Sequence, residues 1–207
     1  MAEDAILIDS SAAAPGKREL RANLRSRRLA LPATERIQAA EAVARHLQQH
    51  PSFDQSGYVA GYWAMAGEVP LHVLQMRLKP GLVWCLPCIQ PDTTLRFAPW
   101  RPGDELVSNR FGIPEPAMAP ESQLTAEAMA VILLPLVGFS RSGQRLGMGG
   151  GYYDRSLAFR QRQPAPPVLI GVGYAFQELP ALATEPWDVA LDAVATEREL
   201  ISCRETG

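Results

Sequence analysis

The amino-acid sequence predicts an α/β domain in which helices are layered on a mostly parallel central sheet. Segments with helical periodicity alternate along the chain with short strand-like segments, which is typical of this fold class. Some of the strand-like segments are continuous apolar runs, as expected for strands buried on both faces. With 16 glycines and 18 prolines among 207 residues, the elements between these breakers must be short. We expect residues 1–16 to form a flexible tail and residues 17–207 to form a single domain.

The first part of the chain predicts two helices followed by a strand–helix–strand unit. Residues 17–29 combine many basic residues with a narrow apolar stripe, formed by Leu20, Leu24 and Leu29. A second helix, ending near residue 50, has apolar residues with a period of 3.6: Ile37, Ala40, Val43, Ala44 and Leu47. The segments that follow predict a strand at 57–63, a short helix at 71–78 and a strand at 82–86.

The second part of the chain predicts further buried strands and one more helix. Residues 87–125 are irregular and rich in proline, with a hairpin expected around residues 95–100. Residues 130–136 form an uninterrupted apolar run of strand length. The remaining elements are a helix at 152–163 and two short strands at 168–172 and 189–194.

A glycine-rich segment carries the strongest local signal for a ligand. Four of the five residues at 147–151 are glycine, and we expect them to lie directly after a buried strand and directly before a helix. Glycine lets backbone N–H groups converge on an anion, the helix end adds its positive dipole, and Arg145 adds a fixed charge. The segment has neither the Walker pattern nor the dinucleotide pattern. A flexible turn is the alternative, but it does not explain the tyrosines and aspartate that follow at once.

The first helix carries a second signal, because its charge is opposite to that of the rest of the chain. Residues 17–28 hold six cations and one acid, which leaves 14 basic and 21 acidic residues elsewhere, a formal charge of −7. Lys17 and Arg21 are four residues apart and share one helix face. A local basic face in an acidic protein suits a small polyanion such as a nucleoside triphosphate. For Arg25, Arg27 and Arg28 we expect a solvated face.

Composition excludes several classes of protein. The chain has 20 basic and 22 acidic residues, whereas a protein that coats duplex DNA usually has a basic surplus. No segment approaches the roughly 18 to 20 apolar residues that span a bilayer. The acidic first residues do not resemble a signal peptide, and three cysteines are too few for a disulfide framework. We therefore expect a cytoplasmic monomer that binds small molecules and neither nucleic acid nor membrane.

Two other groups of residues admit a functional and a structural interpretation. Trp84-Cys85-Leu86-Pro87-Cys88 mimics the redox motif of thioredoxin-like proteins, but turn residues follow it, so two buried thiols in a strand are the better interpretation. Among the carboxylates, Glu68 follows a predicted strand where α/β sheets hold ligands. Asp154 lies in the first turn of the helix after the glycines, so pairing with the helix dipole is its structural alternative. Asp192 interrupts a strand pattern, where a metal would justify a carboxylate.

In their order along the chain, several segments resemble the 5-formyltetrahydrofolate cyclo-ligase family. The resemblance extends from Lys17 to about Glu197. It depends on the basic run at 17–21, on Glu68, and on the following stretches: Gly112-Ile113-Pro114-Glu115-Pro116, Pro135-Leu136-Val137-Gly138-Phe139, the run from Gly143 to Arg155, Gly171-Val172-Gly173-Tyr174, Trp187-Asp188 and Asp192.

This resemblance implies a Rossmann-like three-layer α/β/α sandwich and a reaction that consumes ATP with magnesium. ATP would phosphorylate the formyl oxygen of 5-formyltetrahydrofolate, a neighbouring folate nitrogen would then attack, and phosphate would leave to give 5,10-methenyltetrahydrofolate. The implied catalytic residues are Arg145 and Tyr153. The implied ATP-binding residues are Lys17, Arg18, Glu19, Leu20, Arg21, Arg145, Leu146, Gly147, Met148, Gly149, Gly150, Gly151, Tyr152 and Tyr153. The implied folate-binding residues are Trp63, Glu68 and Tyr153, and the implied Mg²⁺ ligands are Asp154 and Asp192.

The sequence departs from the family pattern at two positions. Ser140 stands where many members have an acidic residue, so any metal role of that position is lost. Trp187 stands where many members have histidine, which removes an imidazole beside Asp188. The alternative function is a non-catalytic nucleotide- or folate-binding protein on the same scaffold, and a thioredoxin-like oxidoreductase is the third interpretation.

Overall fold

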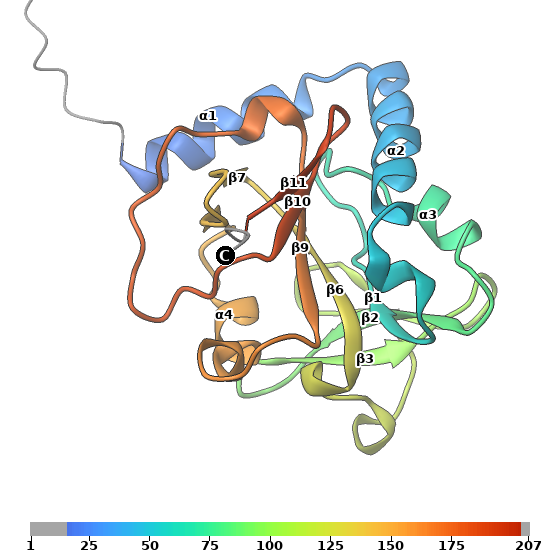
Figure 1. The fold of residues 1–207 in the computed structure, drawn as a ribbon. Helices are drawn as coiled ribbons and strands as arrows, with labels where there is room; N and C mark the ends of the chain where they lie inside the picture. Colours follow the sequence, from blue (N-terminus) through green and yellow to red (C-terminus); the bar gives the residue numbers. More distant parts are fainter. Residues whose placement is uncertain (1–15, 204–207) are drawn as a thin grey trace, which may run out of the picture.

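A single seven-stranded sheet forms the centre of the computed structural model, which describes residues 16–203 (Figure 1). Its strands are β1 (Gly57–Ala60), β2 (Leu82–Ile89), β3 (Leu95–Pro99), β6 (Met129–Pro135), β9 (Val168–Val172), β10 (Ala193–Ala195) and β11 (Leu200–Ser202). They lie in the order β11-β10-β9-β6-β1-β2-β3. The five inner strands are parallel, and β3 and β11 run antiparallel at the two edges. Apart from Gly16, the expected tail at 1–16 lies outside the described residues.

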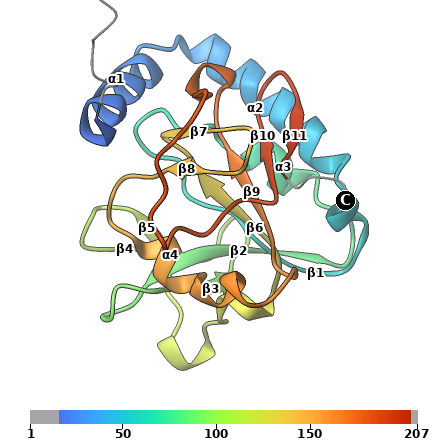
Figure 2. The same cartoon turned by 60° about the vertical axis from the view of Figure 1, so that its left-hand side comes forward.

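Short helices and two small hairpins surround this sheet. The α-helices are α1 (Lys17–Leu29), α2 (Ala33–Gln48), α3 (His72–Met76) and α4 (Tyr152–Ser156). The 3-10 turns are η1 (Pro51–Asp54), η2 (Pro120–Ser122), η3 (Ala126–Ala128), η4 (Ala158–Gln161) and η5 (Ala175–Gln177). The hairpins pair β4 (Leu106–Ser108) with β5 (Pro114–Pro116), and β7 (Gly138–Phe139) with β8 (Arg145–Leu146) (Figure 2). Within residues 16–203 no helix is both long and apolar enough to cross a membrane.

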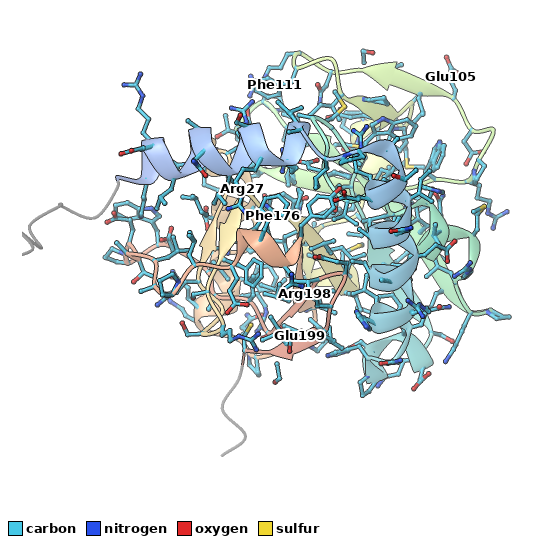
Figure 3. The ribbon with its side chains drawn as sticks, turned by 90° about the horizontal axis from the view of Figure 1, so that it is seen from above. Arg27, Glu105, Phe111, Phe176, Arg198 and Glu199 are labelled. Atoms are coloured by element: carbon cyan, nitrogen blue, oxygen red, sulfur yellow. The ribbon has the colours of Figure 1, made fainter. Side chains whose placement is uncertain are left out.

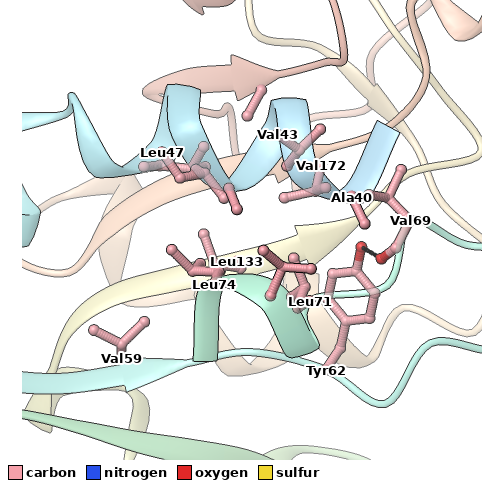
Figure 4. Packing of buried hydrophobic residues seen from close by; sticks show 14 of the residues in the cluster. Ala40, Val43, Leu47, Val59, Tyr62, Val69, Leu71, Leu74, Leu133 and Val172 are labelled. Atoms are coloured by element: carbon pink, nitrogen blue, oxygen red, sulfur yellow. Dashed lines mark hydrogen bonds between the residues drawn. The ribbon is translucent and has the colours of Figure 1, made fainter. Parts of the chain in front are cut away.

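Hydrophobic residues fill both faces of the sheet and create three layers. On one face, α2 and α3 pack against alternate residues of the strands, including Val59, Leu133 and Val172 (Figure 4). The same cluster contains Tyr62, whose hydroxyl donates a hydrogen bond to the Val69 carbonyl at 2.8 Å. On the other face, a second cluster contains Leu157 from the turn after α4. The α/β/α arrangement with a mostly parallel sheet is therefore confirmed.

Several element boundaries differ from the predicted ones. The first strand stops at Ala60, three residues early, and β10 begins only at residue 193. The predicted strand at 82–86 continues to Ile89, because β3 pairs with its second half. This pairing confirms a hairpin at residues 95–100. The predicted helix at 152–163 breaks after Ser156 and continues as η4.

Two residues of the predicted apolar stripes point away from the core. Leu29 and Ile37 are 57% and 61% exposed. In α1 the buried stripe follows a strict four-residue spacing from Leu20 and Leu24 to Arg28. Arg28 is only 1% exposed, so the expectation of a solvated face is wrong for this arginine.

The order of the strands creates a crevice at one end of the sheet. From β1 the chain passes through α3 to β2 on one side, whereas β6 lies on the other side of β1. The direction of the connections thus reverses between β1 and β6. In open α/β sheets, ligands bind outside the carboxyl ends of the strands at such a reversal.

Candidate active site

A cavity of about 650 Å³ lies at this end of the sheet. Its walls come from parts of the chain that are far apart in sequence: α1, the loop after β1, the ends of β2 and β6, the glycine-rich loop 147–151 and the segment 182–188. Both Trp63 and Tyr153 line it, as do Lys17 and Arg21. The structure therefore places the expected folate-binding residues and most of the expected nucleotide-binding residues around one space.

The basic wall of the cavity is formed by one face of α1. Arg21 Nε donates a hydrogen bond to the Gly147 carbonyl at 2.8 Å, and Lys17 Nζ lies 3.5 Å from a carboxylate oxygen of Glu185. The other residues of the predicted run 17–21 are elsewhere: Arg18 and Glu19 are exposed, and Leu20 packs beside Leu24. Among residues 17–21, only Lys17 and Arg21 reach the cavity.

The glycine-rich loop lies against this basic wall. Gly149 and Gly151 have φ angles of +94° and +68°, which residues with a side chain rarely adopt. A Cβ atom at Gly149 would lie 3.8 Å from the Arg21 guanidinium carbon, whereas one at Gly147 would meet no atom within 4 Å. The loop follows β8 and not the buried strand β6, which corrects the expected order of elements. The helix that follows, α4, has only five residues, so its dipole is small.

Arg145 and Asp154, which precede and follow the glycine-rich loop in the sequence, form an ion pair. The Arg145 guanidinium donates to the Asp154 carboxylate and to the Val189 carbonyl. Burial lowers the pKa of Arg145, and the negative charge of Asp154 opposes this shift. Both side chains line the cavity, and their contacts link β8 and α4 to Val189, which follows the segment 182–188.

A second part of the cavity wall is aromatic and contains the carboxylate of Glu68. Trp63 packs edge-on against Trp100, with 5.8 Å between the ring centroids. Burial raises the pKa of the Glu68 carboxyl, while a hydrogen bond from the Met65 N–H acts in the opposite direction. Burial, with the nearby charge of Glu68, also raises the pKa of Tyr153. The Tyr153 hydroxyl is therefore protonated at neutral pH.

The carboxylates in the cavity fit a magnesium ion that arrives with a nucleotide. Asp154 and Asp188 both line the space beside the glycine-rich loop. Mg²⁺ is typically held by one or two carboxylates together with substrate phosphates. In the part of the chain that the structure describes, no group of three His, Cys, Asp or Glu side chains is placed to hold a metal ion.

The structure does not bring Asp192 to this cavity. Its carboxylate accepts hydrogen bonds from Arg160 Nη2 at 2.9 and 3.0 Å, and from the Leu169 N–H at 2.8 Å. Leu169 lies near the amino end of β9, whereas the cavity lies at the carboxyl ends of the strands. The expected pairing of Asp154 with Asp192 is thus not formed in this structure.

Other cavity residues were not identified from the sequence. Tyr62 and Arg28 line the cavity, and so do Asn109 and Phe111 from the turn between β4 and β5. The four-residue spacing in α1 could have identified Arg28. The stretch from Gly112 to Pro116 contributed to the family resemblance, but nothing in the sequence placed Asn109 and Phe111 in the site, because the position of this turn depends on tertiary packing.

Comparisons with known proteins agree with this geometry. The family model of the 5-formyltetrahydrofolate cyclo-ligase family matches residues 13–197. The chain belongs to this family. A 5-formyltetrahydrofolate cyclo-ligase of Haemophilus influenzae is 33% identical over 84% of this chain and 94% of its own length. One of Escherichia coli is 34% identical over 84% of this chain and 96% of its own length. A solved 5,10-methenyltetrahydrofolate synthetase of Aquifex aeolicus superimposes with a TM-score of 0.77, at 29% identity, over 92% of this chain and 94% of its own.

The two departures from the pattern of the cyclo-ligase family lie in different surroundings. Ser140 is buried in the turn between β7 and β8, where its Oγ lies 2.9 Å from Ser142 Oγ and donates to Gln144 at 3.0 Å. It closes this turn and does not line the cavity. Trp187 lines the cavity and is 62% exposed.

The cysteine pair has no property of a redox site. Cys85 and Cys88 both belong to β2 and are both buried. Burial raises the pKa of each thiol to about 12, whereas a redox-active cysteine needs a lowered pKa. This geometry argues against the thioredoxin-like interpretation.

Proposed function

We propose that this chain, acting as a single domain, closes 5-formyltetrahydrofolate into 5,10-methenyltetrahydrofolate at the expense of ATP. One observation carries the proposal: a single cavity joins a basic wall and a glycine-rich loop, suited to phosphates, with an aromatic wall that holds a buried carboxylate. A phosphoryl donor and a flat heterocycle would therefore be held side by side. Placing two reactants together in this way can supply a large part of the rate of a reaction.

The reaction needs positioning and charge more than covalent help from the protein. A formamide oxygen is a poor leaving group, so it first attacks the γ-phosphorus of ATP, the bond to the β-phosphate oxygen breaks, and ADP leaves. A neighbouring folate nitrogen then attacks the formyl carbon, loses its proton, and expels phosphate. Lys17, Arg21 and the N–H groups of loop 147–151 hold the phosphates through these steps.

Two residues are the proposed catalytic groups. Arg145 directs a permanent charge towards the phosphoryl group that is transferred, and Asp154 fixes its orientation. Tyr153 donates a hydrogen bond from its protonated hydroxyl to the bound substrates. Asp154 would hold Mg²⁺, which neutralises phosphate charge when it is bound with the nucleotide. Asp192 as a second ligand stays a prediction of the family resemblance.

The folate is proposed to bind at the aromatic wall. Trp63 offers its ring to the pteridine or the benzoyl ring, and the carboxylate of Glu68 accepts hydrogen bonds from the pteridine. We also propose that the protein works as a monomer in the cytoplasm, where reducing conditions suit its three free cysteines.

One assay tests the proposed reaction. The protein is mixed with 5-formyltetrahydrofolate and Mg-ATP, and the near-ultraviolet absorbance of the methenyl product is followed together with phosphate release. We expect one phosphate per product, no turnover without nucleotide, and no turnover after magnesium is chelated. Binding of both ligands without any product would instead support the non-catalytic alternative.

A further inference from the structure

Arg28 is a buried arginine that connects α1 to the folate wall of the cavity. Its Nε donates to the Ala66 carbonyl at 3.0 Å, and its Nη1 donates to the Leu136 carbonyl at 3.1 Å. The guanidinium thereby ties the loop after β1 to the end of β6. The loop contains one strained residue that such contacts help to hold, because Ala66 has a positive φ angle of 48°.

The same guanidinium lies beside the carboxylate that faces the folate. Nη1 lies 3.7 Å from Glu68 Oε1, which is close enough for an ion pair but too long for a hydrogen bond. Glu68 Oε2 accepts a hydrogen bond from the Met65 N–H at 3.0 Å. Oε1 therefore keeps its lone pairs for a ligand while the neighbouring positive charge favours its ionised form.

A buried arginine of this kind requires a reason. Taking a guanidinium out of water is costly, and Nη2 has no hydrogen-bond partner among the residues that the structure describes. A leucine at this position would continue the stripe of Leu20 and Leu24 without that cost. Groups that lower stability in this way are most often found at functional sites.

We propose that Arg28 is a positioning residue, which keeps Glu68 ionised and fixed as the acceptor for the adjacent amino and ring N–H donors of a reduced pteridine. This inference rests on the proposed function. Two neighbouring donors match the oxygens of one carboxylate, and this match fails when the carboxyl is protonated or turned. Arg28 acts through Glu68 and on the folate, and not on the nucleotide.

The surroundings of Glu68 fix the direction of its response to pH. Arg25 and Arg28 face it from α1, while Tyr62, Tyr153 and Tyr174 face it from the loop after β1, from α4 and from the loop after β9. Burial raises the pKa of Glu68, and the two arginines lower it. Loss of Arg28 therefore raises this pKa further, so folate binding is lost at a higher pH as the solution is acidified.

The test compares Arg28→Met with Arg27→Met, the neighbouring arginine. Arg27 lies over the ring of Phe176 at 4.6 Å and serves as a matched control (Figure 3). In Arg28→Met we expect the KM for 5-formyltetrahydrofolate to rise roughly tenfold, the KM for ATP to change less than twofold, and the acid limb of kcat/KM to move to higher pH. Arg27→Met should match the wild type, and Arg28→Lys should restore most of the loss. Arg28→Gln, which keeps a donor, replaces the methionine variant if the latter does not fold.

A double-mutant cycle with Glu68→Gln separates positioning from general support of the fold. If Arg28 acts through Glu68, Arg28→Gln should add less than a twofold loss of folate affinity in the Glu68→Gln background. Three results would overturn the inference. The first is a full additional tenfold loss of folate affinity when Arg28→Gln is added to Glu68→Gln. The others are an equal loss of affinity for ATP and folate in the Arg28 variant, or an acid limb of its kcat/KM profile that does not move. Absence of turnover in the wild type would contradict the proposed function instead, and direct folate binding would still test Arg28.

Discussion

Lys17 and Arg21 are the two side chains of α1 on which nucleotide binding should depend. Both line the cavity, and Arg21 also donates to the Gly147 carbonyl. A phosphate contact to a charged donor typically contributes about 1.5 to 3 kcal/mol, which corresponds to roughly ten- to a hundredfold in affinity. We expect Lys17→Ala and Arg21→Ala each to weaken ATP binding in this range and to leave folate binding almost unchanged, as measured by calorimetry.

Arg18→Ala is the control for these variants. Arg18 carries the same charge on the same helix but is exposed and does not reach the cavity. Its replacement should change ATP affinity less than twofold in physiological salt. If all three variants lost affinity equally, the general charge of the helix would attract ATP, and the proposed direct contacts would be wrong.

For the cysteines of β2 we expect that substitution leaves the activity almost unchanged. Because burial raises the pKa of Cys85 and Cys88 to about 12, neither thiol forms a reactive thiolate at neutral pH. The double variant Cys85→Ala/Cys88→Ala should keep turnover within a few-fold of the wild type, with and without reductant. Loss of activity in a double variant with an unchanged circular dichroism spectrum would restore a redox role.

At the scale of elements, the glycine-rich loop is the feature whose backbone matters most. Gly149 combines a φ angle of +94° with a place beside Arg21, so a side chain would strain the loop and also enter the space proposed for the phosphates. Gly149→Val should abolish turnover and cost about 1 to 3 kcal/mol of stability through strain. Turnover and thermal melts measure the two effects separately.

Two other glycines distinguish strain from ligand contact. Gly103 has a φ angle of +104°, lies in open space and does not line the cavity, so Gly103→Val should have a similar stability cost with normal turnover. Gly147 has no positive φ angle, and a Cβ atom there would meet no protein atom within 4 Å. Gly147→Ala should therefore keep the stability of the wild type. Any loss of ATP affinity in that variant would then come from contact between the added methyl group and the nucleotide.

The sequence predicts the kinds of elements better than their ends. Helical and strand periodicity identified the inner strands and the helices, because each kind repeats over several residues. The early end of β1 at Ala60 and the break after Ser156 depend on tertiary contacts that leave no periodic signal. In α1, assigning Leu29 to the stripe instead of Arg28 moved the buried face by one residue, so the buried cation was not recognised.

At the scale of the whole molecule, no single segment contains the site. The sequence could indicate the basic helix, the glycine-rich loop and Glu68 separately, because each has a local pattern. Their assembly around one cavity, together with the turn between β4 and β5, results from the strand order and from the packing of α1 across the carboxyl ends of the strands. Ligands that touch several of these segments should therefore hold them together.

This assembly predicts that each ligand stabilises the entire fold. A ligand at a hundred times its Kd adds about 2.7 kcal/mol to the free energy of unfolding. For a domain of this size, that energy corresponds to an increase of roughly 5 to 11 °C in Tm. We expect Mg-ATP and 5-formyltetrahydrofolate each to produce such an increase in differential scanning calorimetry.

The double variant Lys17→Ala/Arg21→Ala tests which part of the site holds ATP. In this variant the increase in Tm with ATP should disappear while the increase with folate remains, since the aromatic wall is intact. Hydrogen exchange of α1 should slow with ATP in the wild type only. If the double variant still gained the full increase with ATP, α1 would not be part of the nucleotide site, and the phosphates would bind to the glycine-rich loop and Arg145 alone.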